Sequence, residues 1–170
     1  MPTVIKLTNL ASYRAYWQDI ANKHKEVDGF RYGDKDVLKN DNRSDMRARL
    51  LWATPYERVP FEDRGSDNVQ KVKKARVAYL KNAASEMFSD IDTCFDQCEA
   101  VIEQILAKVY QDKRGADVAG NWTMLVTDIT SWKMGPVEMK IGSTQYYGWE
   151  LEMNFKDNTN LAYDASKWNS

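Results

Sequence analysis

Thiol and imidazole side chains are scarce in this chain. Its 170 residues include two cysteines, Cys94 and Cys98, and one histidine, His24. Two cysteines are too few for a disulfide framework, and a bridge between positions four apart on one helix would be strained. A structural zinc site needs about four ligands, and the only histidine lies far away in the sequence. We therefore expect both cysteines to pack in the core and His24 to have a structural role.

Long apolar runs and an excess of one charge are also missing. No stretch approaches the roughly 18 apolar residues of a membrane span, and the N-terminus lacks the basic and apolar regions of a signal peptide. With 24 basic and 25 acidic residues, the formal net charge is -1. No strong overall field therefore favours binding to nucleic acid or a membrane surface. These absences predict a protein kept in a reducing cytoplasm, with no membrane partner and no specific nucleic-acid partner.

Common catalytic motifs are absent as well. The sequence has no Gly-rich phosphate loop, no nucleophile elbow and no H-E-x-x-H motif. Glu138-Met139-Lys140 has the Glu-x-Lys form of metal-dependent nucleases, and Asp128, ten residues upstream, is a candidate second ligand. This tripeptide is common by chance in any alternating strand. We expect a protein that is not an enzyme, with no catalytic residue, cofactor or metal, and keep a nuclease as the remote alternative.

What the chain does contain is enough apolar side chain for a core. Hydrophobic residues make up 43% of it and aromatic residues 12%. A chain of this length can bury roughly 70% of the surface that it exposes when unfolded. We expect one domain over residues 1–156 and a polar tail or arm over residues 157–170.

Hydrophobic periodicity predicts the main elements. Apolar spacings of three and four predict a helix over 9–25, capped by Asn9 or Ser12, and a long helix with an apolar stripe from Met87 to Val109. Alternation predicts strands over 46–54, 121–132, 137–141 and, most clearly, 145–156. Segment 69–80 alternates in part and favours a strand, with a helix as the alternative. Turn-forming residues predict a loop over 33–45, a loop or irregular edge over 56–67, a loop over 115–120 and turns at 135–136 and 142–144.

This order predicts an α+β domain, with an antiparallel sheet packed against one long helix plus an N-terminal helix. The last strand alternates strictly, since apolar residues from Tyr147 to Phe155 face one way and polar residues the other. We expect its apolar face to lie under the long helix.

Charged and aromatic residues supply the candidate interfaces. The outer face of the long helix is acidic from Asp90 to Glu103, which is usually no more than a solvated surface. Basic residues of strand 69–80 fall on two faces, which weakens a nucleic-acid site. Acidic and basic patches would nevertheless suit head-to-tail contacts between identical subunits. Two tryptophans outside clear periodic positions are candidate anchors, with core packing and a sugar platform as alternatives. The tentative interface residues are Trp132, Trp168, Lys74, Arg76, Asp92 and Glu99.

The element order and the closing strands resemble the tail-terminator or tail-completion (head–tail connector) proteins of tailed phages. The likeness runs over residues 91–155, where a long helix leads into the polar segment RGADVAGNW and then into TMLVTDITSW and YYGWELEMNF. Its closing pattern is carried by Gly148-Trp149-Glu150-Leu151-Glu152-Met153.

The resemblance implies a non-catalytic virion structural protein that forms a homo-oligomeric ring in the phage neck or tail. Such a subunit assembles in the host cytoplasm, contacts portal, connector or tail proteins, and offers no catalytic residue to carry over. Loops 33–45 and 56–67 would then reach neighbours or line the ring. A small intracellular adaptor or immunity-type protein, which binds one partner through its acidic helix face, stays open as the alternative.

Overall fold

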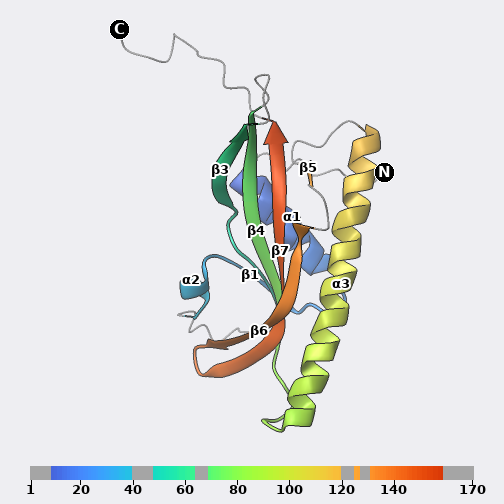
Figure 1. The fold of residues 1–170 in the computed structure, drawn as a ribbon. Helices are drawn as coiled ribbons and strands as arrows, with labels where there is room; N and C mark the ends of the chain where they lie inside the picture. Colours follow the sequence, from blue (N-terminus) through green and yellow to red (C-terminus); the bar gives the residue numbers. More distant parts are fainter. Residues whose placement is uncertain (1–8, 40–47, 64–68, 120–124, 127–130, 159–170) are drawn as a thin grey trace.

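The computed structural model describes residues 9–39, 48–63, 69–119, 125–126 and 131–158. It has two long layers, a sheet and a pair of helices on one of its faces (Figure 1). The predicted α+β class, with an N-terminal helix and one long helix against the sheet, is therefore confirmed. In chain order the elements are α1 (Leu10–Lys23), β1 (Gly29–Tyr32), α2 (Lys35–Lys39), β2 (Arg49–Ala53), β3 (Glu57–Asp63), β4 (Val69–Lys81), α3 (Phe88–Ala119), β5 (Leu125–Val126), β6 (Lys133–Ile141) and β7 (Thr144–Asn158).

The sheet is mixed and mostly antiparallel. Its strand order is β1-β2-β4-β7-β5, with β3 also pairing with β4 and β6 with β7. β4 and β7 form the centre and pair in antiparallel fashion along almost their whole length. Among the described strands only β1 and β2 are parallel, and the connection between them contains α2. Neither β1 nor α2 was predicted, because elements of four and five residues are too short to show a clear period. The predicted loop 33–45 is therefore wrong in part, since it contains α2.

The larger core lies between the sheet and the two helices. Every second residue of β4 and β7 packs there against α1 and α3. The prediction that the apolar face of β7 lies under the long helix is therefore confirmed. Both cysteines are in this core, as expected. The strand residues of this face with an exposure of 2% or less are Leu51, Ala53, Ala75, Val77, Tyr79, Leu151, Met153 and Phe155.

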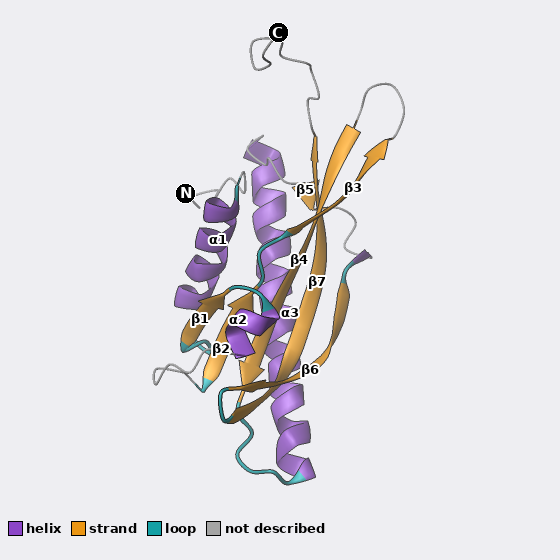
Figure 2. Ribbon diagram, turned by 90° about the vertical axis from the view of Figure 1, so that its left-hand side faces the viewer, coloured by secondary structure: helices purple, strands orange, loops and turns teal. Residues whose placement is uncertain are grey.

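A second, smaller core lies on the opposite face. The β6–β7 hairpin curls across that face toward α2 (Figure 2). Tyr146 and Met139 from the hairpin pack there with Trp52 and Leu80 from the sheet and with Leu38 from α2. The hairpin and α2 thus cover part of this face, and polar residues line the rest.

Several predicted boundaries were wrong. Gly135 and Pro136 do not form a turn but lie within β6. Among the described strands β6 pairs only with β7, so the backbone N–H that Pro136 lacks is not needed on the outer side of β6. α3 continues through most of the predicted loop 115–120, and Met87 precedes the helix and is exposed rather than part of its buried stripe. Of the predicted strand 121–132, the structure describes a two-residue strand, β5. The irregular edge over 56–67 is confirmed by β3, whose register shifts between Val59 and Glu62.

The described helices include none with the length and apolar character that a membrane span requires. β7 continues to Asn158, and residues 159–170, including Trp168, lie outside the described part of the chain.

Candidate interaction surfaces

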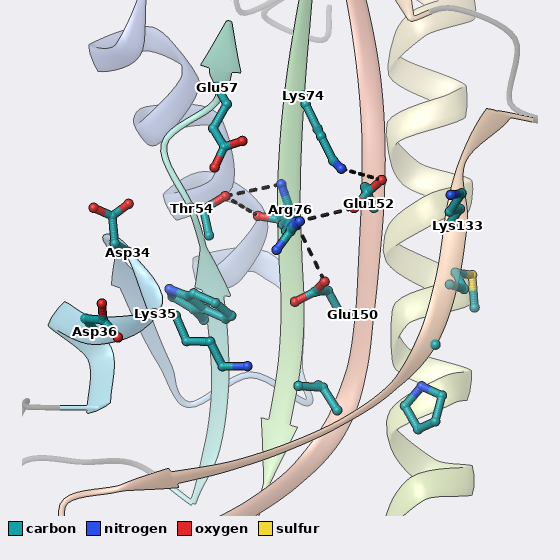
Figure 3. A pocket seen from close by; sticks show the side chains of 15 residues that line it. Asp34, Lys35, Asp36, Thr54, Glu57, Lys74, Arg76, Lys133, Glu150 and Glu152 are labelled. Carbon is teal, nitrogen blue, oxygen red and sulfur yellow. Dashed lines mark hydrogen bonds and ion pairs between the residues drawn. The ribbon is translucent and has the colours of Figure 1, made fainter. Parts of the chain in front are cut away.

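A groove of about 600 Å³ lies on the sheet face opposite α1 and α3 (Figure 3). β4 and β7 form its floor, α2 and the start of β3 border one side, and β6 borders the other. Its lining mixes charged residues with a few apolar ones. The charged residues are Asp34, Lys35, Asp36, Glu57, Lys74, Arg76, Lys133, Glu150 and Glu152, and the apolar ones include Trp52, Met134, Pro136 and Val137.

Ion pairs between β4 and β7 neutralise much of the groove floor. Lys74 Nζ lies 2.9 Å from a Glu152 carboxylate oxygen, and Arg76 Nε lies 3.4 Å from Glu152 and 4.0 Å from Glu150. Cross-strand neighbours on one face of a sheet are close enough to interact in this way. Lys74 and Arg76 therefore share a face, as predicted, but they are already paired within the chain. They do not form the free basic patch that a head-to-tail contact would need.

The sides of the groove carry charges of both signs without salt-bridge partners. Lys35 on α2 and Lys133 on β6 form no ion pair with any described residue. The same holds for Asp34, Asp36 and Glu57 on the α2–β3 side. Among the described residues, the α2–β3 side of the groove thus carries three carboxylates and Lys35 without ion-pair partners, and the β6 side carries Lys133.

The outer surface of α3 and of the residues just before it forms a separate acidic patch. Between Glu86 and Glu103 the chain has six carboxylates and no basic residue. Asp92 is exposed and Glu99 partly exposed, so both predicted residues lie on this patch. Within the described part of the chain, no Lys or Arg forms a salt bridge with any of the six. The patch residues are Glu86, Asp90, Asp92, Asp96, Glu99 and Glu103.

Two large apolar side chains are exposed at the same end of α3. Met87 is 66% exposed and Phe88 86% exposed. We call this pair the α3 tip. The sequence did not reveal the tip, because Met87 falls in phase with the buried stripe, and only the helix start at Phe88 shows that it lies outside.

Of the two tryptophans predicted as interface anchors, one packs against the core and the other lies outside the described residues. Trp132 is partly buried against the larger core, with its ring centroid 6.4 Å from that of Phe155. Its indole Nε1 is buried and has no hydrogen-bond partner among the described residues. Trp149 is also partly buried on this core. Core packing thus accounts for Trp132 and Trp149, while the candidate Trp168 lies outside the described residues.

The two cysteines form a buried pair. Their exposures are 3% for Cys94 and 0% for Cys98, and their sulfurs lie 3.6 Å and 3.7 Å from the carbonyl oxygens of Lys81 and Tyr147. The hydrogen bond between the thiols lowers the pKa of Cys94 and raises that of Cys98, and burial raises the pKa of Cys98 further. Neither thiol is accessible enough to act on a large substrate.

The remaining candidates are His24 and the residues of the Glu-x-Lys pattern. His24 caps the C-terminal end of α1 and contacts Gln104 of α3 through Nε2 at 3.2 Å, a structural role as predicted. Glu138 and Lys140 are exposed on β6, and Asp128 lies outside the described residues. The described part of the chain holds no group of three or more His, Cys, Asp or Glu side chains placed to bind a metal ion.

Comparison of the chain with models of protein families and with curated proteins finds no match. The functional argument therefore starts from the groove, the acidic patch and the α3 tip.

Proposed function

We propose that this protein is a non-catalytic assembly subunit that forms a homo-oligomeric ring in the neck or tail of a tailed phage, as a tail terminator or head–tail connector. One observation carries the proposal: the acidic patch has no cationic partner within the described part of its own chain and adjoins the exposed α3 tip. Exposed aromatic and Met side chains surrounded by polar residues are typical of protein interfaces.

Charge segregation supports contact between identical chains. The patch takes six of the 25 acidic residues and none of the 24 basic ones, so the rest of the chain carries 24 basic against 19 acidic residues. An exposed acidic patch is attracted to exposed basic side chains on other copies of the chain. Because two different surfaces meet in such a contact, identical subunits can close into a ring.

The edges at β6 and β3 favour contacts through side chains over extension of the sheet. The outer side of β6 contains Pro136 among exposed charged residues, and β3 contains Pro60 beside its register shift. Proline, charge and irregular register are the features that protect edge strands from pairing with other chains. The subunit contacts are therefore expected on the helix and groove surfaces.

The phage assignment rests on the resemblance of residues 91–155, where a long helix precedes closing antiparallel strands. It implies the virion as location, assembly in the host cytoplasm, and portal, connector or tail proteins as neighbours. The intracellular adaptor remains the second candidate, since the acidic patch would also suit a basic partner of another kind.

The test measures molar mass by light scattering over a range of protein and salt concentrations, with negative-stain microscopy of the largest species. We expect closed rings whose stability falls as salt rises, because screening weakens contacts between exposed charges. A chain that stays monomeric at every concentration and salt, also when mixed with the tail proteins of its own genome, ends the proposal. A complex of one chain with one foreign partner would favour the adaptor.

A further inference from the structure

We infer that the outer face of α1 in one copy packs against the outward-facing carboxylates of α3 in the next copy. The inference rests on the proposed function, because it names the two surfaces that meet between neighbours in the ring. It gives the acidic patch one occupant, the α1 helix of a second identical chain.

Five outward-facing residues of α3 fall on one straight stripe. Their successive spacings are four, four, three and four positions, and side chains at such spacings line up along one side of a helix. The first is 86% exposed and apolar, and the four that follow are carboxylates. Such a stripe is matched by the regular side-chain spacing of another helix. We call these residues the acidic stripe; they are Phe88, Asp92, Asp96, Glu99 and Glu103.

The outer face of α1 carries charge of the opposite sign. Arg14 and Lys25 are exposed there and form no ion pair with any described residue. The only carboxylate within α1, Asp19, is already paired with Lys23 at 2.7 Å, and Glu26, just after α1, is paired with an arginine of β2. The unpaired charge on this face is therefore positive among the described residues, and it attracts the carboxylates of α3.

The two cations match two of the carboxylates in spacing. Eleven positions separate Arg14 from Lys25, which lies in the turn directly after α1, and eleven separate Asp92 from Glu103. At a rise of about 1.5 Å per residue, eleven positions span roughly 16 Å along a helix axis. An antiparallel α1 therefore brings Arg14 to Glu103 and Lys25 to Asp92 at the same time. The Arg14 guanidinium lies over the Tyr32 ring, 5.6 Å from its centroid, and a stacked guanidinium keeps N–H groups at its edge for a carboxylate.

The antiparallel direction follows from the arrangement within one chain. The Tyr16 hydroxyl of α1 donates to Asp112 of α3 at 3.0 Å, and His24 contacts Gln104 at 3.2 Å. Positions thus rise along α1 as they fall along α3, so the two helices are antiparallel. Rotation about a ring axis that runs along the helices leaves their directions unchanged. The α1 of a neighbouring copy is then again antiparallel to α3.

The two faces lie on opposite flanks of the helix layer. α1 and α3 border each other on one face of the sheet (Figure 2). Arg14 precedes Tyr16, which faces α3, by two positions, or about 200° around the helix. The acidic stripe likewise points away from Lys108, which faces α1. One copy can thus contact two neighbours through different surfaces, as a heterologous ring contact requires.

The experiment reverses the charges of one predicted pair in the full chain. Arg14→Glu and Glu103→Arg are each expected to weaken self-association by about tenfold, because an attractive exposed pair becomes a repulsive one. The double variant Arg14→Glu/Glu103→Arg again has opposite charges across the contact. Its self-association is expected to return to within about threefold of that of the unchanged chain. Sedimentation velocity over a range of protein concentrations measures all three variants.

Cysteine pairs test the direction of the contact. The double variant Arg14→Cys/Glu103→Cys is expected to form disulfides between copies under mild oxidation, seen on a non-reducing gel. Arg14→Cys/Asp92→Cys is the pair that a parallel contact would join, and we expect no cross-link from it. Cys94 and Cys98 are buried and do not compete. Cross-links through position 92 and none through position 103 would overturn the antiparallel contact.

Lys140→Glu and Glu138→Arg are the matched controls, since they make the same reversals at exposed positions of β6 outside both faces. Both are expected to assemble as the unchanged chain does, and circular dichroism checks that every variant is folded. If Arg14→Glu and Glu103→Arg assemble normally, or if the double variant does not recover, this inference is overturned and the proposed function stands. An unchanged chain that never self-associates overturns both.

Discussion

At the level of single residues, the structure gives Gly148 a role in the fold, because this position in β7 has no room for a side chain. It begins the closing pattern that resembles phage tail proteins. A Cβ at this position would lie 2.0 Å from the carbonyl oxygen of Tyr79 and 3.0 Å from Cα of Leu80. β7 therefore approaches β4 too closely for any side chain, at the point where the hairpin with β6 begins to curl over the second core. Glycine is required here because only it allows such close approach of two backbones.

Replacement of Gly148 tests this requirement. Gly148→Ala is expected to lower the free energy of unfolding by about 3 kcal/mol or more, because the backbone of β4 has to move. Gly135→Ala is the control, since its Cβ meets nothing within 4 Å, and we expect a change within about 0.5 kcal/mol. Denaturation with urea measures both. Equal stability of the two variants would contradict the close approach of β7 to β4.

Buried tyrosines are a second feature at this level. Burial raises the pKa of Tyr13, Tyr16 and Tyr79 above their usual value, and for Tyr16 the Asp112 carboxylate that accepts its hydrogen bond raises it further. A group whose pKa is higher in the folded state stabilises the fold below its unfolded pKa, here 10.0. That contribution is lost as the pH rises above this value.

The free energy of unfolding should therefore fall steeply as the pH rises into the alkaline range. Each of these tyrosines contributes a loss of about 1.4 kcal/mol per pH unit above pH 10. Tyr79→Phe is expected to make the dependence of the unfolding free energy on pH less steep by the contribution of one tyrosine. It also removes the 2.7 Å hydrogen bond that the Tyr79 hydroxyl donates to the Glu26 carbonyl, which lowers stability at every pH. Unfolding free energies from pH 9 to about pH 11 give the slope. If the slope is the same in Tyr79→Phe, Tyr79 is not held protonated by the fold.

At the level of the elements, local sequence rules worked where an element is long or has a clear end. α1 begins with a capping box, in which the Asn9 side chain accepts from Ser12 N at 2.9 Å and the Ser12 hydroxyl accepts from Asn9 N at 3.1 Å. Both residues proposed as the cap are thus used together. β7 was predicted nearly to its ends, because strict alternation over many residues fits no other element.

Loss of the cap should be measurable. Asn9→Ala removes the side-chain acceptor of the first turn and is expected to cost about 1 kcal/mol of stability, whereas Asn9→Ser keeps an oxygen at the same place and should cost only a few tenths. Thermal unfolding followed by circular dichroism compares the two. Equal losses in both variants would mean that the side-chain oxygen of Asn9 does not cap α1.

At the level of the whole molecule, a near-zero net charge conceals a strongly uneven distribution. The overall balance of -1 predicted no electrostatic preference for a partner. The acidic patch nevertheless concentrates six carboxylates on the first half of α3 and the residues just before it. Interactions between exposed charges fade beyond about 10 Å at moderate salt. A neighbouring copy therefore responds to the local patch more than to the sum over the chain.

Charge reversal on the patch tests its part in assembly. Asp92→Lys combined with Asp96→Lys is expected to weaken self-association and to flatten its salt dependence, because the attraction becomes repulsion. Glu138→Lys makes the same kind of change at an exposed position of β6 outside the groove and should have little effect. Sedimentation at two salt concentrations measures the difference. If the double variant assembles as well as Glu138→Lys, the patch has no role in assembly.

The amino-acid sequence by itself determined the class of fold, the two main helices, the central strands and the face that each strand buries. These follow from local periodicity, which one chain segment carries alone. Only the tertiary structure decided that Lys74 and Arg76 pair with Glu152, that the β6–β7 hairpin covers part of the second face, and that Met87 and Phe88 stay outside. Each of these depends on strand register or on where a helix starts relative to the sheet. Both are set by packing between segments far apart in the sequence, so no local pattern reveals them.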